Sequence, residues 1–138
     1  MATGDLNNDL RIDLVTLANG KVTVQFNGLE EAQTLSLAKP GAADLLLTDY
    51  DNDGWLDLLV FAESGTEQDS LLRNSGDGTF TDQTALSGLD DTQSINDCAG
   101  SGWTASPTAG AAWWDMDGDG YLDIYLSNFI CWTDFTFY

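Results

Sequence analysis

The chain has 138 residues, with 23 acidic and only 4 basic side chains, for a formal net charge of −19. This length suits one modest domain with a core, and the acidity disfavours partners such as nucleic acid or an anionic membrane surface. The chain has no histidine, which removes the commonest general base and zinc ligand, and no apolar run long enough for membrane insertion.

Short apolar or alternating runs predict β-strands along the whole chain, and no segment has a convincing helical period. In chain order the predicted strands are residues 14–15, 21–26, 34–37, 43–48, 58–60, 70–74, 79–82, 110–114 and 124–126. Hairpin turns are expected at Asn19-Gly20 and at residues 75–78, which read Ser-Gly-Asp-Gly. The apolar runs that flank the acidic loops are expected to be covered on both faces.

A nine-residue acidic motif occurs three times between these strands, and it holds 11 of the 23 acidic residues. Each copy has an oxygen-bearing side chain at positions 1, 3, 5 and 9. The predicted metal ligands are Asp5, Asn7, Asp9 and Asp13 in the first loop, Asp49, Asp51, Asp53, Asp57 and the Trp55 carbonyl oxygen in the second, and Asp115, Asp117, Asp119, Asp123 and the Tyr121 carbonyl oxygen in the third.

Hard oxygen ligands at this density suit Ca²⁺, which takes about six to eight oxygens. A glycine at position 6 lets the second and third loops turn sharply. The first loop has Leu10 there, and a leucine at positive φ costs about 1 kcal/mol, so we expect two calcium sites and a weaker third. A solvated acidic turn is the alternative. An EF-hand would need a Glu at position 12, where the chain has Val60 or Leu126.

Four strands per repeat, joined by glycine-rich turns, predict an all-β fold of β-propeller-type blades, with a calcium loop in the first hairpin of each blade. The expected units are residues 1–40, 41–90 and 109–138, with residues 89–108 inserted as a surface loop. This makes about two full blades and partial ones, whereas a closed propeller needs about four to eight. We therefore expect a fragment of a larger chain, or copies that associate.

The motif D-x-D-x-D-G-x-x-D followed by an apolar strand resembles the FG-GAP/VCBS repeat of integrin-α-like propellers. Residues 72–84, which read L-R-N-S-G-D-G-T-F-T-D-Q-T, then Ser-Gly-Leu at 87–89 and Gly-Ala-Ala-Trp at 110–113, are similar to bacterial VCBS-repeat proteins related to ASPIC/UnbV and cartilage acidic protein. The resemblance covers most of the chain. It implies calcium held in each blade's first hairpin and a secreted or cell-surface location.

The two cysteines, Cys98 and Cys131, fit either one disulfide or two buried thiols. Calcium loops without the Glu of a cytosolic sensor favour a calcium-rich, oxidising exterior, and therefore the disulfide.

The aromatic residues have two predicted roles. Trp113, Trp114 and Tyr125 are expected to pack between blades. Trp103, in the inserted loop, is the candidate for an exposed platform that stacks on a glycan or a partner, although the loop itself reads more simply as a solvated connector.

The function expected from these features is a non-catalytic, calcium-binding extracellular module for adhesion, protein interaction or surface assembly. Its expected partners are another protein, further copies that associate through open blade edges, or a glycan. The alternatives are the propeller portion of a polysaccharide-acting enzyme and a subunit of an extracellular filament. Against catalysis, the chain lacks histidine, and Asp90, Asp91 and Asp97 have no evident base or nucleophile beside them.

Overall fold

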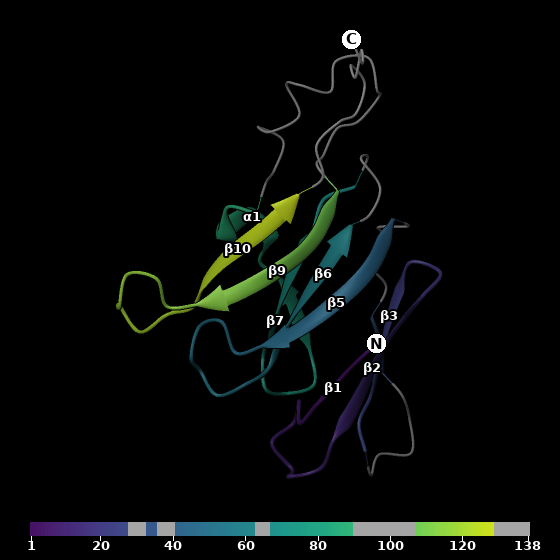
Figure 1. The fold of residues 1–138 in the computed structure, drawn as a ribbon. Helices are drawn as coiled ribbons and strands as arrows, with labels where there is room; N and C mark the ends of the chain where they lie inside the picture. Colours follow the sequence, from purple (N-terminus) through teal and green to yellow (C-terminus); the bar gives the residue numbers. More distant parts are fainter. Residues whose placement is uncertain (28–32, 36–40, 63–66, 90–106, 129–138) are drawn as a thin grey trace.

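The computed structural model describes residues 1–27, 33–35, 41–62, 67–89 and 107–128, which fold mainly into antiparallel β-sheet (Figure 1). The first sheet contains β1 (Ala2–Gly4), β2 (Asp13–Ala18), β3 (Lys21–Gln25) and β4 (Gln33–Leu35). The second contains β5 (Ala42–Thr48), β6 (Asp57–Ala62), β7 (Ser70–Asn74) and β8 (Phe80–Asp82). The third contains β9 (Thr108–Trp114) and β10 (Asp123–Asn128).

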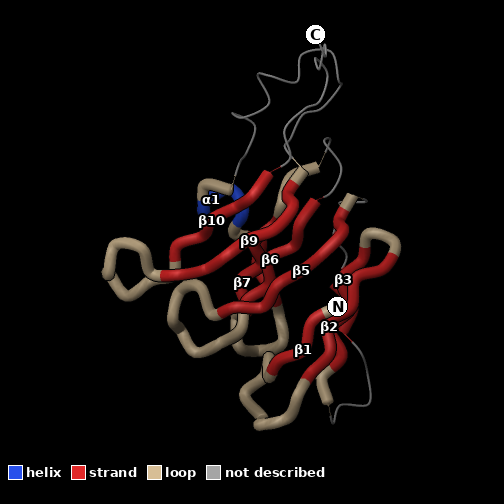
Figure 2. The backbone as a smooth tube through the Cα atoms, viewed as in Figure 1, coloured by secondary structure: helices blue, strands red, loops and turns tan. Residues whose placement is uncertain are grey.

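Within each sheet, strands that follow one another in the chain are hydrogen-bonded neighbours, in the order β1-β2-β3-β4, β5-β6-β7-β8 and β9-β10. The prediction of four strands per repeat is therefore confirmed for the first two repeats. The described strands form three separate sheets that do not close into a ring (Figure 2). The all-β class is thus confirmed, and the described residues show no closed propeller.

Both hairpin turns that the sequence predicts are present in the structure. Asn19 and Gly20 both have positive φ, 51° and 70°, which matches the right-handed twist of the strands β2 and β3 that they join. Between β7 and β8, the backbone N–H of Ser75 donates to the carbonyl oxygen of Thr79 at 2.9 Å and closes the second predicted turn.

The sheets stack face to face, with one apolar cluster in each of the two layers between them. The buried members of the first cluster are Leu6, Val15, Val22, Val24, Phe26, Leu45, Leu58, Val60 and Leu72. Those of the second are Leu59, Phe61, Leu71 and Leu89. Strand β6 contributes to both clusters because its residues alternate between the two layers, and all six of them are buried.

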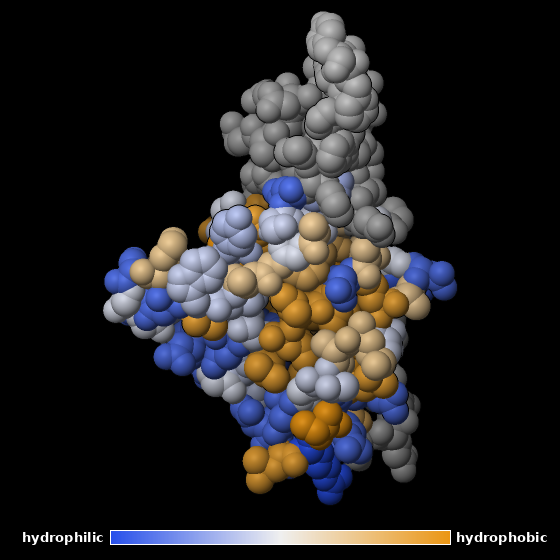
Figure 3. Space-filling view, viewed as in Figure 1, coloured by the Kyte–Doolittle hydropathy of each residue, from blue (hydrophilic) through white to orange (hydrophobic). Residues whose placement is uncertain are grey.

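The first strands of the second and third sheets, β5 and β9, lie toward the viewer in Figure 1. Strand β1 lies against β5, and β9 lies against β6. Figure 3 shows apolar residues over the middle of these strands and hydrophilic residues around the loops at the lower left. Each acidic loop joins the first two strands of its sheet.

Some predictions of burial are wrong within this chain. Strand β6 is covered on both faces, but β9 is not, and Trp114 and Tyr125 are 41% and 59% exposed rather than packed between blades. Trp113 does pack against the second cluster, as predicted. The reason is that β9 and β10 have the second sheet on one face only, so alternate side chains face outward.

A single helical turn, α1 (Thr84–Ser87), was not predicted. Four residues are too few to show a helical period. The turn ends at Gly88, which has the left-handed conformation typical of a helix C-terminus, with φ of 76°. The Thr84 hydroxyl oxygen accepts a hydrogen bond from the backbone N–H of Leu71 at 3.1 Å, so α1 is held against β7.

The predicted surface insertion, residues 89–108, is anchored at both ends, because Leu89 and Thr108 are buried. The residues between them, apart from residue 107, lie outside the described part of the chain, together with Cys98, Trp103 and the acidic residues at 90, 91 and 97. Cys131 and residues 129–138 of the third unit also lie outside it. Among the described residues, no helix has the length and apolar character to cross a membrane.

Candidate metal centres

All three acidic loops are built around the aspartate at position 1. The Asp49 carboxylate accepts hydrogen bonds from the backbone N–H groups of Asp53 and Gly54, at 3.0 and 2.9 Å. The Asp5 and Asp115 carboxylates accept the same pair of N–H groups in their own loops, from positions 5 and 6. These bonds curl each loop tightly around its first aspartate.

Position 6 has positive φ in every loop. Gly54 and Gly120 have φ of 89° and 92°, and Leu10 has φ of 67°. The expectation that Leu10 would occupy a glycine conformation is therefore confirmed. Its side chain is 94% exposed, so the strain is not offset by packing.

The aspartate at position 9 is the first residue of the outgoing strand and closes each loop. One oxygen of Asp13, Asp57 or Asp123 accepts the backbone N–H of position 2, at 2.8, 3.1 and 2.8 Å respectively. Asp13 and Asp57 have no exposed surface. The other oxygen of Asp13 accepts the backbone N–H of Asn27, two residues after β3, and that of Asp57 accepts the backbone N–H of Asn74, the last residue of β7, both at 2.8 Å.

The second and third loops each bring three carboxylates together. Oxygens of Asp49, Asp51 and Asp57 lie within 4.8 Å of one another, and so do those of Asp115, Asp117 and Asp123. Two ligands of one calcium ion lie at most about 5 Å apart, because each Ca–O distance is about 2.3–2.6 Å. In addition, Asp51 Oδ1 is buried without a hydrogen-bond partner. The donor set therefore fits a hard cation.

Not every predicted ligand joins these groups. Asp53 and Asp119 lie outside the two triads, and each accepts the backbone N–H of the residue two positions on, Trp55 or Tyr121. The first loop, in residues 1–27 that the structure describes throughout, has no triad among Asp5, Asp9 and Asp13. The roles predicted for the Trp55 and Tyr121 carbonyl oxygens, and for Asn7, remain predictions.

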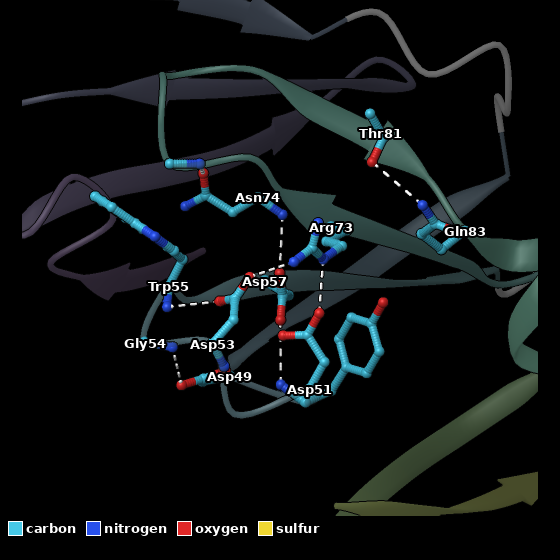
Figure 4. Close-up of polar contacts among 12 residues, drawn as sticks. Asp49, Asp51, Asp53, Gly54, Trp55, Asp57, Arg73, Asn74, Thr81 and Gln83 are labelled. Atoms are coloured by element: carbon cyan, nitrogen blue, oxygen red, sulfur yellow. Dashed lines mark hydrogen bonds and ion pairs between the residues drawn. The ribbon is translucent and has the colours of Figure 1, made fainter. Parts of the chain in front are cut away.

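Arg73 is the residue that the search for ligands missed (Figure 4). It lies on β7, its Nε is 2.6 Å from Asp51 Oδ2, and its Nη2 is 2.5 Å from Asp53 Oδ2. The position beside Asn27 that matches Arg73 holds Phe26, so the first loop has no such cation. The only sequence signal was that Arg73 is one of four basic residues in an acidic chain.

Asn74 was also missed as a site residue, and it joins the first two sheets. It is 1% exposed, and its side-chain Nδ2 donates to the carbonyl oxygens of Leu6 at 2.9 Å and Leu56 at 3.1 Å. Its Oδ1 accepts the backbone N–H of Gly76 at 3.0 Å. Asn74 thus fixes the second loop, the β7–β8 turn and the first loop relative to one another.

The loops also contact one another directly. Asn8 of the first loop donates from Nδ2 to the carbonyl oxygen of Gly54 in the second, at 3.0 Å. The N–H of Leu122 in the third loop donates to the carbonyl oxygen of Tyr50 at 3.4 Å. The three candidate centres therefore form a row along one end of the stacked sheets.

Burial and neighbouring acids shift the titration of one carboxyl group in the second loop. The pKa of Asp57 is raised from its usual 3.8 to about 6, and burial is the largest cause. The N–H groups of Asn74 and Tyr50 oppose this shift, and the charges of Asp51 and Asp53 add to it. A divalent cation would reverse the charge repulsion and favour the ionised carboxylate.

The chain matches a known protein family. The sequence matches the FG-GAP-like repeat over residues 5–60 and again over residues 49–126. This protein belongs to the FG-GAP-like repeat family. Each match starts at position 1 of an acidic loop and ends in the second strand of the next sheet. Each matched segment therefore includes two successive acidic loops. No curated protein and no solved structure was found to match the chain.

Proposed function

We propose that this FG-GAP-like chain is a non-catalytic, calcium-binding module of the extracellular space or cell surface, which serves adhesion, protein interaction or surface assembly. One observation carries the proposal: two loops each bring three carboxylates to one point, and in the second loop a buried oxygen, Asp51 Oδ1, has no partner. Carboxylates held this close repel one another, and a divalent ion relieves the repulsion.

Calcium in this proposal is a structural ligand. The triads Asp49, Asp51 and Asp57 and Asp115, Asp117 and Asp123 hold the ion, and the ion supplies positive charge that stabilises the curled loops. This use suits the proposed extracellular location, where calcium is abundant enough to fill sites of modest affinity. The hydrogen bonds between neighbouring loops would let a loop that is ordered by calcium stabilise the loop of the adjacent sheet.

Thermal unfolding with and without calcium tests the proposal. A ligand that binds only the folded state adds about 2.7 kcal/mol per site at a hundredfold excess over Kd. We expect calcium to raise the melting temperature and excess chelator to lower it, with magnesium at the same concentration less effective. The double variant Asp51→Asn and Asp117→Asn should lose most of the calcium response. A melting temperature that is the same in calcium and in chelator would rule out the proposal.

A further inference from the structure

Every sheet of this protein has two chemically distinct faces, defined by position relative to its acidic loop. The leading face points toward the preceding sheet, and the trailing face points toward the following sheet. In the second sheet the leading face carries Leu47 and Leu58, in the first cluster, and the trailing face carries Leu46 and Leu59, in the second cluster. The same assignment holds for the other two sheets.

Position 2 of each loop belongs to the trailing side. Leu6, in the first loop, is 1% exposed in the cluster between the first and second sheets. Tyr50, in the second loop, stacks on Trp113 of the third sheet, with ring centroids 6.4 Å apart. Met116, the matching residue of the third loop, is 68% exposed. Two of the three equivalent side chains are thus covered by the next sheet.

The second strand of each sheet repeats this pattern. Val15 and Leu59 occupy equivalent positions on the trailing faces of the first two sheets, and neither has exposed surface. Their equivalent in the third sheet, Tyr125, is 59% exposed. Beside it, Trp114 is 41% exposed, with its ring centroid 6.2 Å from that of Tyr125. The third sheet therefore presents an uncovered face that is apolar and aromatic.

The leading face of the first sheet differs from the leading faces of the other two. Those of the second and third sheets are apolar: Leu47, Leu58, Val60 and Leu72 in the second, and Ala111, Trp113, Ile124 and Leu126 in the third. The residues of the first sheet that match those of the second are Thr3, Leu14, Thr16 and Gln25. Three of these four are polar, so this face lacks the apolar surface that holds the sheets together.

We propose that the sheets stack in one direction only: the trailing face of the third sheet docks the apolar leading face of a further FG-GAP-like blade, whereas the leading face of the first sheet takes none. The occupant follows from continuity with the two interfaces already present, in which a trailing face always meets an apolar leading face. The first sheet of a second copy does not qualify, because its leading face is polar. A polar outer face is the property of a capping repeat.

Trp114 adds a requirement on the partner. Its equivalents are Gly4 and Thr48, and a Cβ on Gly4 would lie 2.6 Å from Leu56 Cδ1, so the first sheet leaves no room for a side chain there. An indole at this position needs space instead. The docking blade must therefore leave a recess opposite Trp114.

Rebuilding the leading face of the first sheet tests the proposal. The variant Thr3→Leu, Thr16→Val and Gln25→Leu copies Leu47, Val60 and Leu72 of the second sheet, so one molecule then carries both complementary faces. In sedimentation experiments in saturating calcium, we expect this variant to form head-to-tail chains that grow with concentration, with association at least about tenfold tighter than in the wild type.

The matched control adds Tyr125→Ser and Met116→Ser, which should abolish the association because the trailing face of the third sheet is lost. Circular dichroism checks that each variant is folded, and the isosteric pair Thr3→Val and Thr16→Val replaces the triple variant if that does not fold. A folded variant that associates no more than wild type would overturn the proposal. So would association that persists in the control, or wild-type dimers that join two Tyr125 faces.

This inference depends on the packing of the sheets and not on metal binding. The two proposals can therefore fail separately, since one is read from melting in chelator and the other from sedimentation in calcium.

Discussion

The second and third acidic loops have the same residue types at every proposed ligand position, yet their surroundings differ. In the second loop, Asp57 is fully buried and Arg73 pairs with two of the acids. In the third, Asp115 and Asp117 are exposed, and no basic side chain of the described residues pairs with them. The motif thus determines which oxygen atoms can bind a cation. The neighbouring strands determine how much a bound cation would stabilise the loop.

The largest expected difference between the two loops is at position 9. We expect Asp57→Ala to lower the free energy of unfolding in chelator by about 3 kcal/mol, because it leaves two N–H groups, of Tyr50 and Asn74, without their acceptor in a buried site. Asp123→Ala should cost about 1 kcal/mol, since Asp123 is only half-buried. Urea unfolding measures both, and equal losses would contradict the comparison.

Asp13→Ala extends this test to the first loop. Counting carboxylates predicts that it is the mildest of the three changes, since the first loop has only three of them. The structure predicts otherwise in chelator, because Asp13 is as buried as Asp57 and accepts two N–H groups in the same way. We expect a loss close to that of Asp57→Ala, and adding calcium should change it little. A large calcium-dependent loss would instead reveal a strong site in the first loop.

Acid should weaken calcium binding by the second loop. The pKa of Asp57 is raised to about 6, so the metal-free fold binds this proton more tightly than the unfolded chain does. The stabilisation that comes from this tighter proton binding is therefore present below about pH 4 and lost as the pH rises through about 6. Calcium competes with the same proton, so its affinity should fall about tenfold from pH 7 to pH 5.

Calorimetric titration of the Asp117→Asn variant, in which the third loop is disabled, measures this change. Circular dichroism at both pH values serves as the control for folding. Equal affinity at pH 5 and pH 7 would contradict the assignment of Asp57 to the site.

Arg73→Met should make the second loop behave more like the third. Removing the guanidinium takes away the charge that balances Asp51 and Asp53, so metal-free stability should fall. The stabilisation by calcium should increase, because the ion no longer meets a neighbouring cation. Melting curves in chelator and in calcium give both numbers, and Lys21→Met, in the first sheet, is the control for net charge. A smaller calcium response would show that Arg73 instead orients the ligands.

Leu10→Gly is the smallest expected effect. It relieves positive φ at an exposed position of the first loop, and the extra freedom of glycine in the unfolded chain offsets part of the gain. We expect a net stabilisation of about 0.5 kcal/mol. The mirror change, Gly120→Ala, should destabilise the third loop by a similar or larger amount. If Leu10→Gly is destabilising, the leucine must have a role that its exposure does not reveal.

The sequence by itself determined the local features of this protein. Alternating and apolar runs predicted nearly every strand, and Asn19-Gly20 predicted its hairpin. The spacing of aspartates predicted four side chains at one point in the second loop and four in the third, and three of the four meet in each. These features could be read because they depend on backbone conformation and side-chain direction over a few residues. The single turn of α1 was too short to leave a comparable signal.

The tertiary structure alone decided the contacts between distant segments. Arg73 reaches Asp51 across 22 residues, and Asn74 reaches the Leu6 carbonyl across 68. Whether Trp113 or Trp114 is covered depends on which face of β9 meets the second sheet, although both are tryptophans in one apolar run. The physical reason is that such contacts depend on strand register and on how whole sheets stack. A one-residue shift in the register of a strand would move its buried side chains to the opposite face of the sheet.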